Sequence, residues 1–185
     1  MVMMKPISTF KHSVAALWVT WLFSLPLGAE EAALLEALKG AEPMEAGRIE
    51  TELTTLWSRS GSAAMDFLLK RGRDAIDVND WPKAIEHLTA LTDHAPDFAE
   101  GYHARAIAYF RSERIGPAMA DLERALELNP NNFGALRGVA TVWEALGNSK
   151  RAHAAYGMVL DLHPNDEEAQ KGHERTRLAA FGQAL

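Results

Sequence analysis

The chain of 185 residues contains no cysteine. It therefore has no disulfide framework, no thiolate metal site, no cysteine nucleophile and no cysteine-linked lipid anchor. It also lacks an excess of positive charge, because its net charge is −6 at pH 7. An acidic balance gives no electrostatic footprint for nucleic acid, so we expect no nucleic-acid partner.

Motifs of catalysis and metal binding are missing as well. The histidines are scattered, and none forms an H-E-x-x-H pattern or a comparable pair with a carboxylate on one helical face. Ser60-Gly61-Ser62 follows no predicted strand, so it is not a nucleophile elbow. No glycine belongs to a phosphate-binding G-x-x-x-x-G-K motif. We predict no catalytic residues, no metal ligands and no cofactor, and hence a protein that is not an enzyme.

The first residues have the order of a secretory signal. Lys5 and Lys11 precede an apolar run from Val14 to Leu27, and Gly28 and Ala29 place small residues after it. We expect residues 1–29 to be a signal peptide cleaved after Ala29, and the mature protein to be periplasmic or secreted by a bacterium.

An uncleaved anchor is the alternative interpretation of this segment. The apolar run has 14 residues, whereas a transmembrane helix needs about 20, which favours cleavage. If the segment is retained, the protein is anchored in the inner membrane and faces the periplasm. A membrane is expected as a partner only in that case.

Three prolines, Pro96, Pro130 and Pro164, are spaced 34 residues apart. The same spacing recurs in columns of alanine, of large apolar residues and of small residues, and six columns in phase over three periods indicate a repeat. Each period is predicted to hold two helices, because small residues allow close helix crossing and proline ends the second helix. The other columns are Ala84, Ala118 and Ala152; Leu88, Leu122 and Tyr156; Ala75, Tyr109 and Trp143; Gly72, Ala106 and Ala140; and Leu68, Tyr102 and Leu136.

This period and this order of bulky, small, aromatic, alanine and proline positions resemble the tetratricopeptide repeat (TPR) family. The resemblance covers residues 65–166 and implies an all-α fold, an α-α superhelix (solenoid) of three repeats with helical caps. The sequence departs from the family pattern at Arg71, Arg105 and Ala75, which suggests a looser first repeat. We divide the chain into the signal (1–29), an N-terminal hairpin or cap (30–64), repeats at 65–98, 99–132 and 133–166, and a C-terminal capping helix and tail (167–185).

The resemblance also implies a function, the binding of a protein or peptide in the concave groove lined by the first helices. Apolar groove residues are candidate anchors, and arginines can pair with carboxylates of a partner. The alternative is that terminal helices fill the groove of so short an array and cover these residues. The candidate contact residues are Leu69, Arg73, Ile76, His103, Ile107, Phe110, Arg111, Arg137, Thr141 and Glu144.

One type of TPR partner is argued against. Family members that bind chaperone C-terminal tails use lysine, asparagine and arginine at set groove positions. Those positions hold Leu69, Ala104, Gly134 and Gly138, with Arg73 where asparagine is usual, so this carboxylate clamp is absent. We expect an exported adaptor or scaffold of the bacterial envelope with another protein or peptide partner, or a membrane-tethered structural scaffold if the signal is retained.

Overall fold

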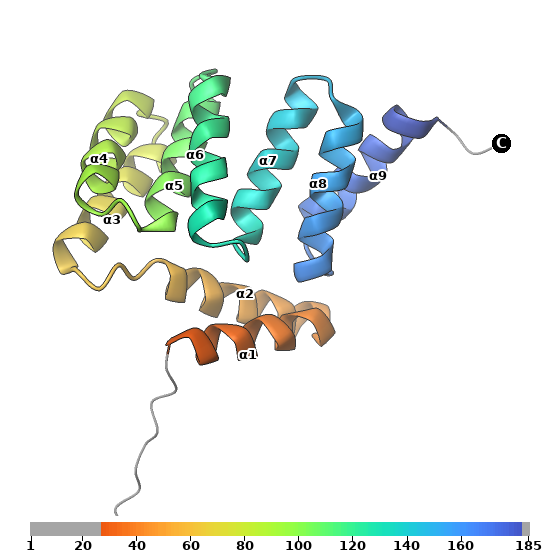
Figure 1. Ribbon diagram of the computed structural model, residues 1–185, viewed down its shortest axis with the longest axis horizontal. Helices are drawn as coiled ribbons and strands as arrows, with labels where there is room; N and C mark the ends of the chain where they lie inside the picture. Colours follow the sequence, from red (N-terminus) through yellow and green to blue (C-terminus); the bar gives the residue numbers. More distant parts are fainter. Residues whose placement is uncertain (1–26, 183–185) are drawn as a thin grey trace, which may run out of the picture.

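The computed structural model describes residues 27–182, and within that range the chain is helical, with no strand (Figure 1). Most of the predicted signal segment, residues 1–26, lies outside the described residues. The helices are α1 (Leu27–Gly40), α2 (Pro43–Trp57), α3 (Ala63–Asp77), α4 (Trp81–His94), α5 (Ala99–Arg111), α6 (Ile115–Leu128), α7 (Phe133–Ala145), α8 (Ser149–Leu162) and α9 (Glu167–Phe181).

Helices α3 to α8 form three antiparallel pairs that stack side by side, which confirms the predicted fold class. The first helices α3, α5 and α7 contact one another in turn and line one side of the stack. Each second helix ends just before one of the periodic prolines, Pro96, Pro130 or Pro164. The 34-residue period therefore predicted the number of these helices, and its prolines predicted where each second helix ends.

Side-chain caps fix several helix starts at matching positions of the period. Asn132 and Asp166 begin α7 and α9, and their oxygens accept hydrogen bonds from the backbone N–H of Ala135 and Ala169. Asp80 begins α4 in the same way, by accepting from the backbone N–H of Lys83. Each cap satisfies a donor that the helix cannot pair itself and contributes about 1 kcal/mol.

The small residues of the repeat lie where helices cross. Ala84, Ala118 and Ala152 are fully buried. A Cβ atom added to Gly72 of α3 would lie 2.4 Å from Cγ of Leu88 in α4. Close crossing of the paired helices therefore depends on the absence of a side chain at this position.

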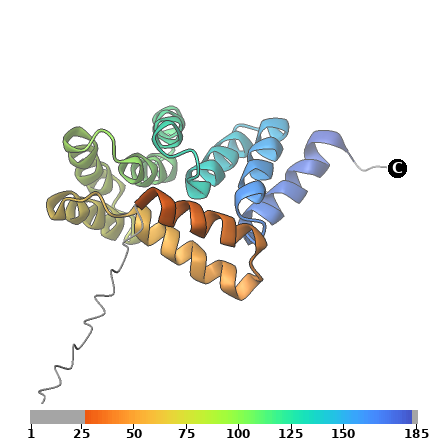
Figure 2. The ribbon, with the colours of Figure 1, turned by 60° about the horizontal axis from the view of Figure 1, so that its bottom comes forward.

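The N-terminal hairpin, α1 and α2, lies across the side of the stack that α3, α5 and α7 line (Figure 2). It packs mainly on α7 and α8: Leu38 and Leu53 are fully buried in one apolar cluster with Phe133, which is 1% exposed. The sequence predicted a cap for this segment. The structure places the hairpin across the concave side, and the outward face of α3 leaves Phe67 58% exposed.

Specific contacts explain this position of the hairpin. The rings of Trp57 and Phe133 lie 5.1 Å apart between centroids, and Phe133 also meets His163 edge-on at 5.3 Å. The side-chain amide of Asn165 donates to the carbonyl of Ala41 at 2.7 Å. The apolar stripe of the hairpin is thus buried against the last repeat.

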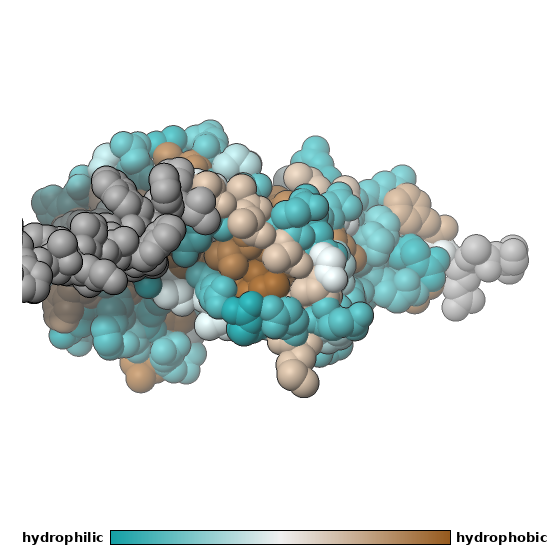
Figure 3. Space-filling model, turned by 90° about the horizontal axis from the view of Figure 1, so that it is seen from below, coloured by the Kyte–Doolittle hydropathy of each residue, from teal (hydrophilic) through white to brown (hydrophobic). Residues whose placement is uncertain are grey.

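The outer surface of the hairpin differs from this buried face. Seen from below, it presents apolar residues ringed by polar ones (Figure 3).

Helix α9 continues the stack by packing against α8. Arg175 of α9 forms an ion pair with Glu144 of α7, and the imidazoles of His153 and His173 stack with centroids 3.8 Å apart. Among residues 27–182, the helices are too short or too polar to cross a bilayer.

Candidate functional site

A cleft opens between the hairpin and the first helices of the repeats. This inner cleft has a volume of about 360 Å³. Apolar and polar side chains from α2, α3, α5 and α7 share its surface. The lining residues are Glu50, Thr54, Trp57, Arg73, Ile76, Asp77, Glu100, His103, Ala104, Ile107, Asn132, Phe133, Gly134 and Arg137.

A second cleft, the open cleft, adjoins the first between α5 and α7. Its volume is about 330 Å³, and none of the hairpin residues lines it. His103, Ile107, Gly134 and Arg137 line both clefts, so the two are continuous. The open cleft is lined by His103, Ala106, Ile107, Phe110, Arg111, Leu122, Gly134, Arg137, Gly138, Thr141, Val142 and Glu168.

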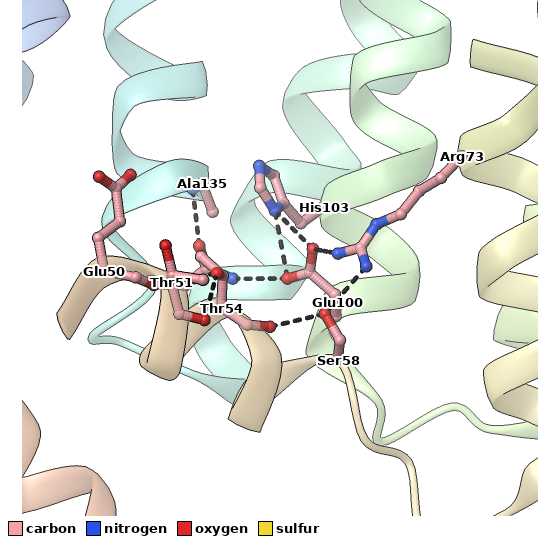
Figure 4. Close-up of polar contacts among 9 residues, drawn as sticks. Glu50, Thr51, Thr54, Ser58, Arg73, Glu100, His103 and Ala135 are labelled. Atoms are coloured by element: carbon pink, nitrogen blue, oxygen red, sulfur yellow. Dashed lines mark hydrogen bonds and ion pairs between the residues drawn. The ribbon is translucent and has the colours of Figure 1, made fainter. Parts of the chain in front are cut away.

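A polar network around Glu100 forms one wall of the inner cleft (Figure 4). The carboxylate of Glu100 pairs with Arg73 of α3 and with His103 Nδ1, 3.3 Å away. It also accepts a hydrogen bond from Asn132 Nδ2 at 3.2 Å. Arg73 in addition donates to Ser58 Oγ at 2.9 Å. The network thereby joins α3, α5 and the start of α7 to the end of the hairpin.

Glu100 remains ionised in this network although it is buried. Burial acts to raise its pKa, but the facing His103 and Arg73 outweigh burial, and the pKa is lowered from its ordinary value of 4.5. A buried charge is stable only when it is paired and hydrogen-bonded. Glu100 therefore serves to hold Arg73 and His103 in place at the cleft.

Arg137 lies where the two clefts meet. Its guanidinium pairs with the buried carboxylate of Asp166 and with Glu168, 3.3 Å away. These acids come from the start of α9, so the C-terminal helix sets the position of this groove arginine. Arg137 is thereby neutralised within the protein.

Arg111 differs from the other groove cations. It is exposed at the end of α5, lines the open cleft and, within residues 27–182, makes no ion pair with an acid. Ile107, one turn earlier on the same helix, is 38% exposed although it is apolar. The cleft therefore presents an unpaired positive charge close to uncovered apolar surface.

The hairpin supplies the remaining wall through Glu50, Thr54 and Trp57. The indole N–H of Trp57 donates to Glu31 of α1 at 3.1 Å. Glu50 pairs with the buried His163 at 3.3 Å, and this hydrogen bond lowers the pKa of Glu50. The wall is thus fixed to α1 on one side and to the end of α8 on the other.

The repeat and the groove agree with a match to a known family. The sequence pattern of the tetratricopeptide repeat matches residues 69–133 and, a second time, residues 103–167, together more than half of the chain.

The chain belongs to the tetratricopeptide repeat family.

Similar TPR proteins have been described in bacteria and in animals. A TPR repeat-containing protein of Rhizobium etli is 32% identical over 130 residues, which cover 70% of this chain and 64% of that protein. Serine/threonine-protein phosphatase 5 of Rattus norvegicus is 29% identical over 107 residues, 58% of this chain and 21% of the phosphatase. The chain thus spans less than two thirds of these relatives.

Solved TPR structures share the fold. The first TPR of Spaghetti (RPAP3), bound to the HSP90 peptide SRMEEVD, has a TM-score of 0.62 and 27% identity, over 64% of this chain and 94% of that chain. The Arabidopsis OM64 TPR domain has a TM-score of 0.60 and 25% identity, over 62% and 94% of the two chains.

Most of the predicted groove residues line the two clefts. Arg73 and Ile76 lie in the inner cleft, and Phe110, Arg111 and Thr141 lie in the open cleft. Their helices carry them there because positions of the TPR unit that face the groove repeat every 34 residues. The structure also places the N-terminal hairpin against the groove. The hairpin covers part of the inner cleft, as the alternative of a terminal element in the groove expected, but it does not reach the open cleft.

Two predicted groove residues lie elsewhere. Leu69 is 2% exposed and belongs to a buried cluster with Leu88 and Ala104, because the small residues of α5 leave space that Leu69 fills. Glu144 accepts from Tyr156 Oη and pairs with Arg175 of α9, so it attaches the last helix. Neither side chain therefore lines the two clefts.

Other cleft residues had no signal in the local sequence. Trp57, Thr54 and Glu50 reach the cleft only because the hairpin docks on the last repeat. Ala29, the predicted cleavage position, lies in the first turn of α1. Within the described part of the chain, no group of three or more histidine or acidic side chains is placed to hold a metal ion.

Proposed function

We propose that this chain is a non-catalytic adaptor whose concave cleft binds an extended segment of a partner protein. The observation that carries the proposal is the combination of exposed Ile107 and unpaired Arg111 at the mouth of a continuous cleft. At protein interfaces, a few apolar and arginine side chains commonly supply most of the binding energy. The RPAP3 domain, which has the same fold, binds a peptide, and this supports the proposal.

Crosslinking in the native host tests this function. A photo-crosslinking amino acid placed at Ile107 is expected to capture one partner, whereas the same group at Glu86, exposed on α4, is not. The double variant Phe110→Ala, Arg111→Ala should abolish the crosslink from position 107. Equal crosslinking from both positions, or no effect of the double variant, would overturn the proposed role of the cleft.

We further propose that the adaptor works in the bacterial envelope after removal of residues 1–29. The support is the sequence order of charge, apolar run and small residues. Intact-mass measurement of protein purified from the periplasm is expected to give a chain that starts at Glu30. A full-length mass in the membrane fraction would instead favour a tethered scaffold.

A further inference from the structure

The hairpin gives this TPR domain a cleft wall that its repeats alone do not have. We propose that the α1–α2 hairpin is a fixed wall of the binding cleft and that it selects partner segments in which a bulky apolar side chain neighbours a carboxylate. The inference rests on the function proposed above and specifies its partner. The hairpin's apolar contribution is Trp57, and Thr54 lies one turn before the C-terminal end of the same helix.

The wall is fixed because it is attached along its whole length. Leu38 and Leu53 are fully buried, and Trp57 packs on Phe133. Lifting the hairpin would return apolar surface of these side chains to water, which is unfavourable. Elements that open and close are drawn from the least buried parts of a protein, and the hairpin is not one of them.

Polar contacts hold the hairpin at three further points. Asn165 bonds to the carbonyl of Ala41 at the turn of the hairpin, and His163 pairs with Glu50 near the middle of α2. At the far end, Arg73 donates to Ser58. The inner cleft consequently keeps its hairpin wall whether or not a partner is bound.

The inner cleft has an apolar side suited to one or two large side chains. It is lined by one apolar side chain from each of four helices: Trp57, Phe133, Ile76 and Ile107. Its volume of about 360 Å³ is near the lower end of the range for ligand pockets, roughly 300–1,000 Å³. A short apolar segment fits this space, whereas an entire amphipathic helix does not.

The charges of the clefts explain why the proposed partner segment carries a carboxylate beside its apolar side chain. Glu100 pairs with Arg73, and Arg137 pairs with Asp166 and with Glu168, the acid that lines the open cleft. Within residues 27–182 this leaves Arg111 as the arginine of the open cleft that makes no ion pair. Asp77, at the α3 side of the inner cleft, makes no ion pair within residues 27–182 and disfavours an acid there. A carboxylate of the partner is therefore directed to the Arg111 side of the apolar residue.

Selection from a display library of random ten-residue peptides tests the proposal. With the full chain as bait, the selected peptides are expected to share a large apolar residue next to Asp or Glu. Recovery of no binding peptide would sink the proposed function itself. Binding peptides without this pair would leave the function standing and overturn the inference.

Variants of the hairpin test its role as a wall. Thr54→Gln puts a longer uncharged side chain into the inner cleft and should weaken binding of a selected peptide about 10-fold, a typical loss for a blocked anchor. Thr55→Gln is the matched control, because Thr55 is exposed on the same helix and lies away from the cleft. Circular dichroism checks that both variants fold. Equal affinities of the two variants would refute a wall function.

Arginine variants test the charge requirement. Arg111→Ala should weaken the selected peptide about 5-fold or more, within the range of a charge-assisted hydrogen bond, and should remove the preference for Asp or Glu in a repeated selection. Arg59→Ala, an exposed arginine outside both clefts, should change neither. A preference for acids that survives Arg111→Ala would contradict the assignment.

A covalent lock separates a fixed wall from a moving lid. The chain has no cysteine, so a pair introduced by Ala41→Cys and Asn165→Cys, where the two residues are in contact, can be joined by oxidation or by a short bis-maleimide. Locked and unlocked proteins should bind the selected peptide with equal Kd. A Kd at least 10-fold weaker in the locked protein would show that the hairpin must move, and would overturn the fixed wall.

Discussion

At the scale of single residues, Glu100 connects several of the side chains that line the inner cleft. It is 7% exposed and receives contacts from Arg73, His103 and Asn132. Glu100→Ala should lower the free energy of unfolding by about 3 kcal/mol, because it breaks a buried ion pair and leaves its partners uncompensated. Urea denaturation followed by circular dichroism measures this loss. Glu123→Ala, at an exposed position, should change stability by no more than about 0.5 kcal/mol.

The same carboxylate gives a defined pH dependence. Because the pKa of Glu100 is lowered in the folded protein, its contribution to stability is complete above the ordinary value of 4.5 and is lost as the pH falls through the lowered value. The stability difference between wild type and Glu100→Ala should therefore shrink as the pH falls below the ordinary pKa of 4.5. Urea titrations at each pH test this. A difference that grows on acidification would mean that Glu100 is protonated in the fold.

Residue positions in the groove could be predicted only in part. The period placed Ile107, Arg111 and Arg137 on the cleft side because these helices stack as the repeat requires. It misplaced Leu69, because the burial of one position also depends on the size of its neighbours in the next helix. The network at Glu100 was likewise hidden, since its members come from α3, α5 and the N-cap of α7 with no shared local pattern.

At the scale of helices, the crossing of α3 and α4 depends on Gly72. Gly72→Ala would bring a methyl group to 2.4 Å from Cγ of Leu88, and such overpacking costs about 1–3 kcal/mol. This exceeds the gain of about 1 kcal/mol that alanine offers over glycine in a helix. We therefore expect a lower melting temperature, measured by thermal denaturation.

Gly47 provides the matched control for this substitution. It lies within α2, and a Cβ atom there would meet no neighbour within 4 Å. Gly47→Ala should raise stability by up to about 1 kcal/mol, because only the helix propensity changes. If both substitutions stabilise the protein, the close crossing at Gly72 is not a packing constraint.

The sequence predicted the six helices of the repeats, but it did not predict which surface the α1–α2 hairpin packs against. Columns at 34-residue spacing predicted the six central helices, because each column records a contact repeated in every unit. The hairpin has an apolar stripe with Leu38, Ile49 and Leu53, which shows that one face is buried. A stripe alone does not state which surface buries it, so the docking of the hairpin on α7 and α8 required the three-dimensional structure.

At the scale of the whole molecule, the hairpin and the last repeat share one apolar core. Residues of α1 and α2 are clustered with residues of α7, α8 and α9, whereas α3, α4 and α5 contribute to a separate cluster. Contacts such as Ala41 with Asn165 join segments far apart in sequence. Cooperative units in proteins follow such shared cores. The two ends of the described chain should therefore unfold together, in contrast to the nearest-neighbour behaviour of a simple repeat array.

Hydrogen exchange measured by mass spectrometry tests this coupling. Leu53→Ala removes a fully buried side chain of α2 and should cost about 2–5 kcal/mol. We expect faster exchange in α1 and α2 and also in α7 and α8, with a smaller change in α3 and α4. Thr51→Ala, exposed on the same helix, should leave all these rates nearly unchanged. Faster exchange confined to α1 and α2 would mean that the hairpin is an independent appendage, because a shared core cannot lose one member without exposing the others.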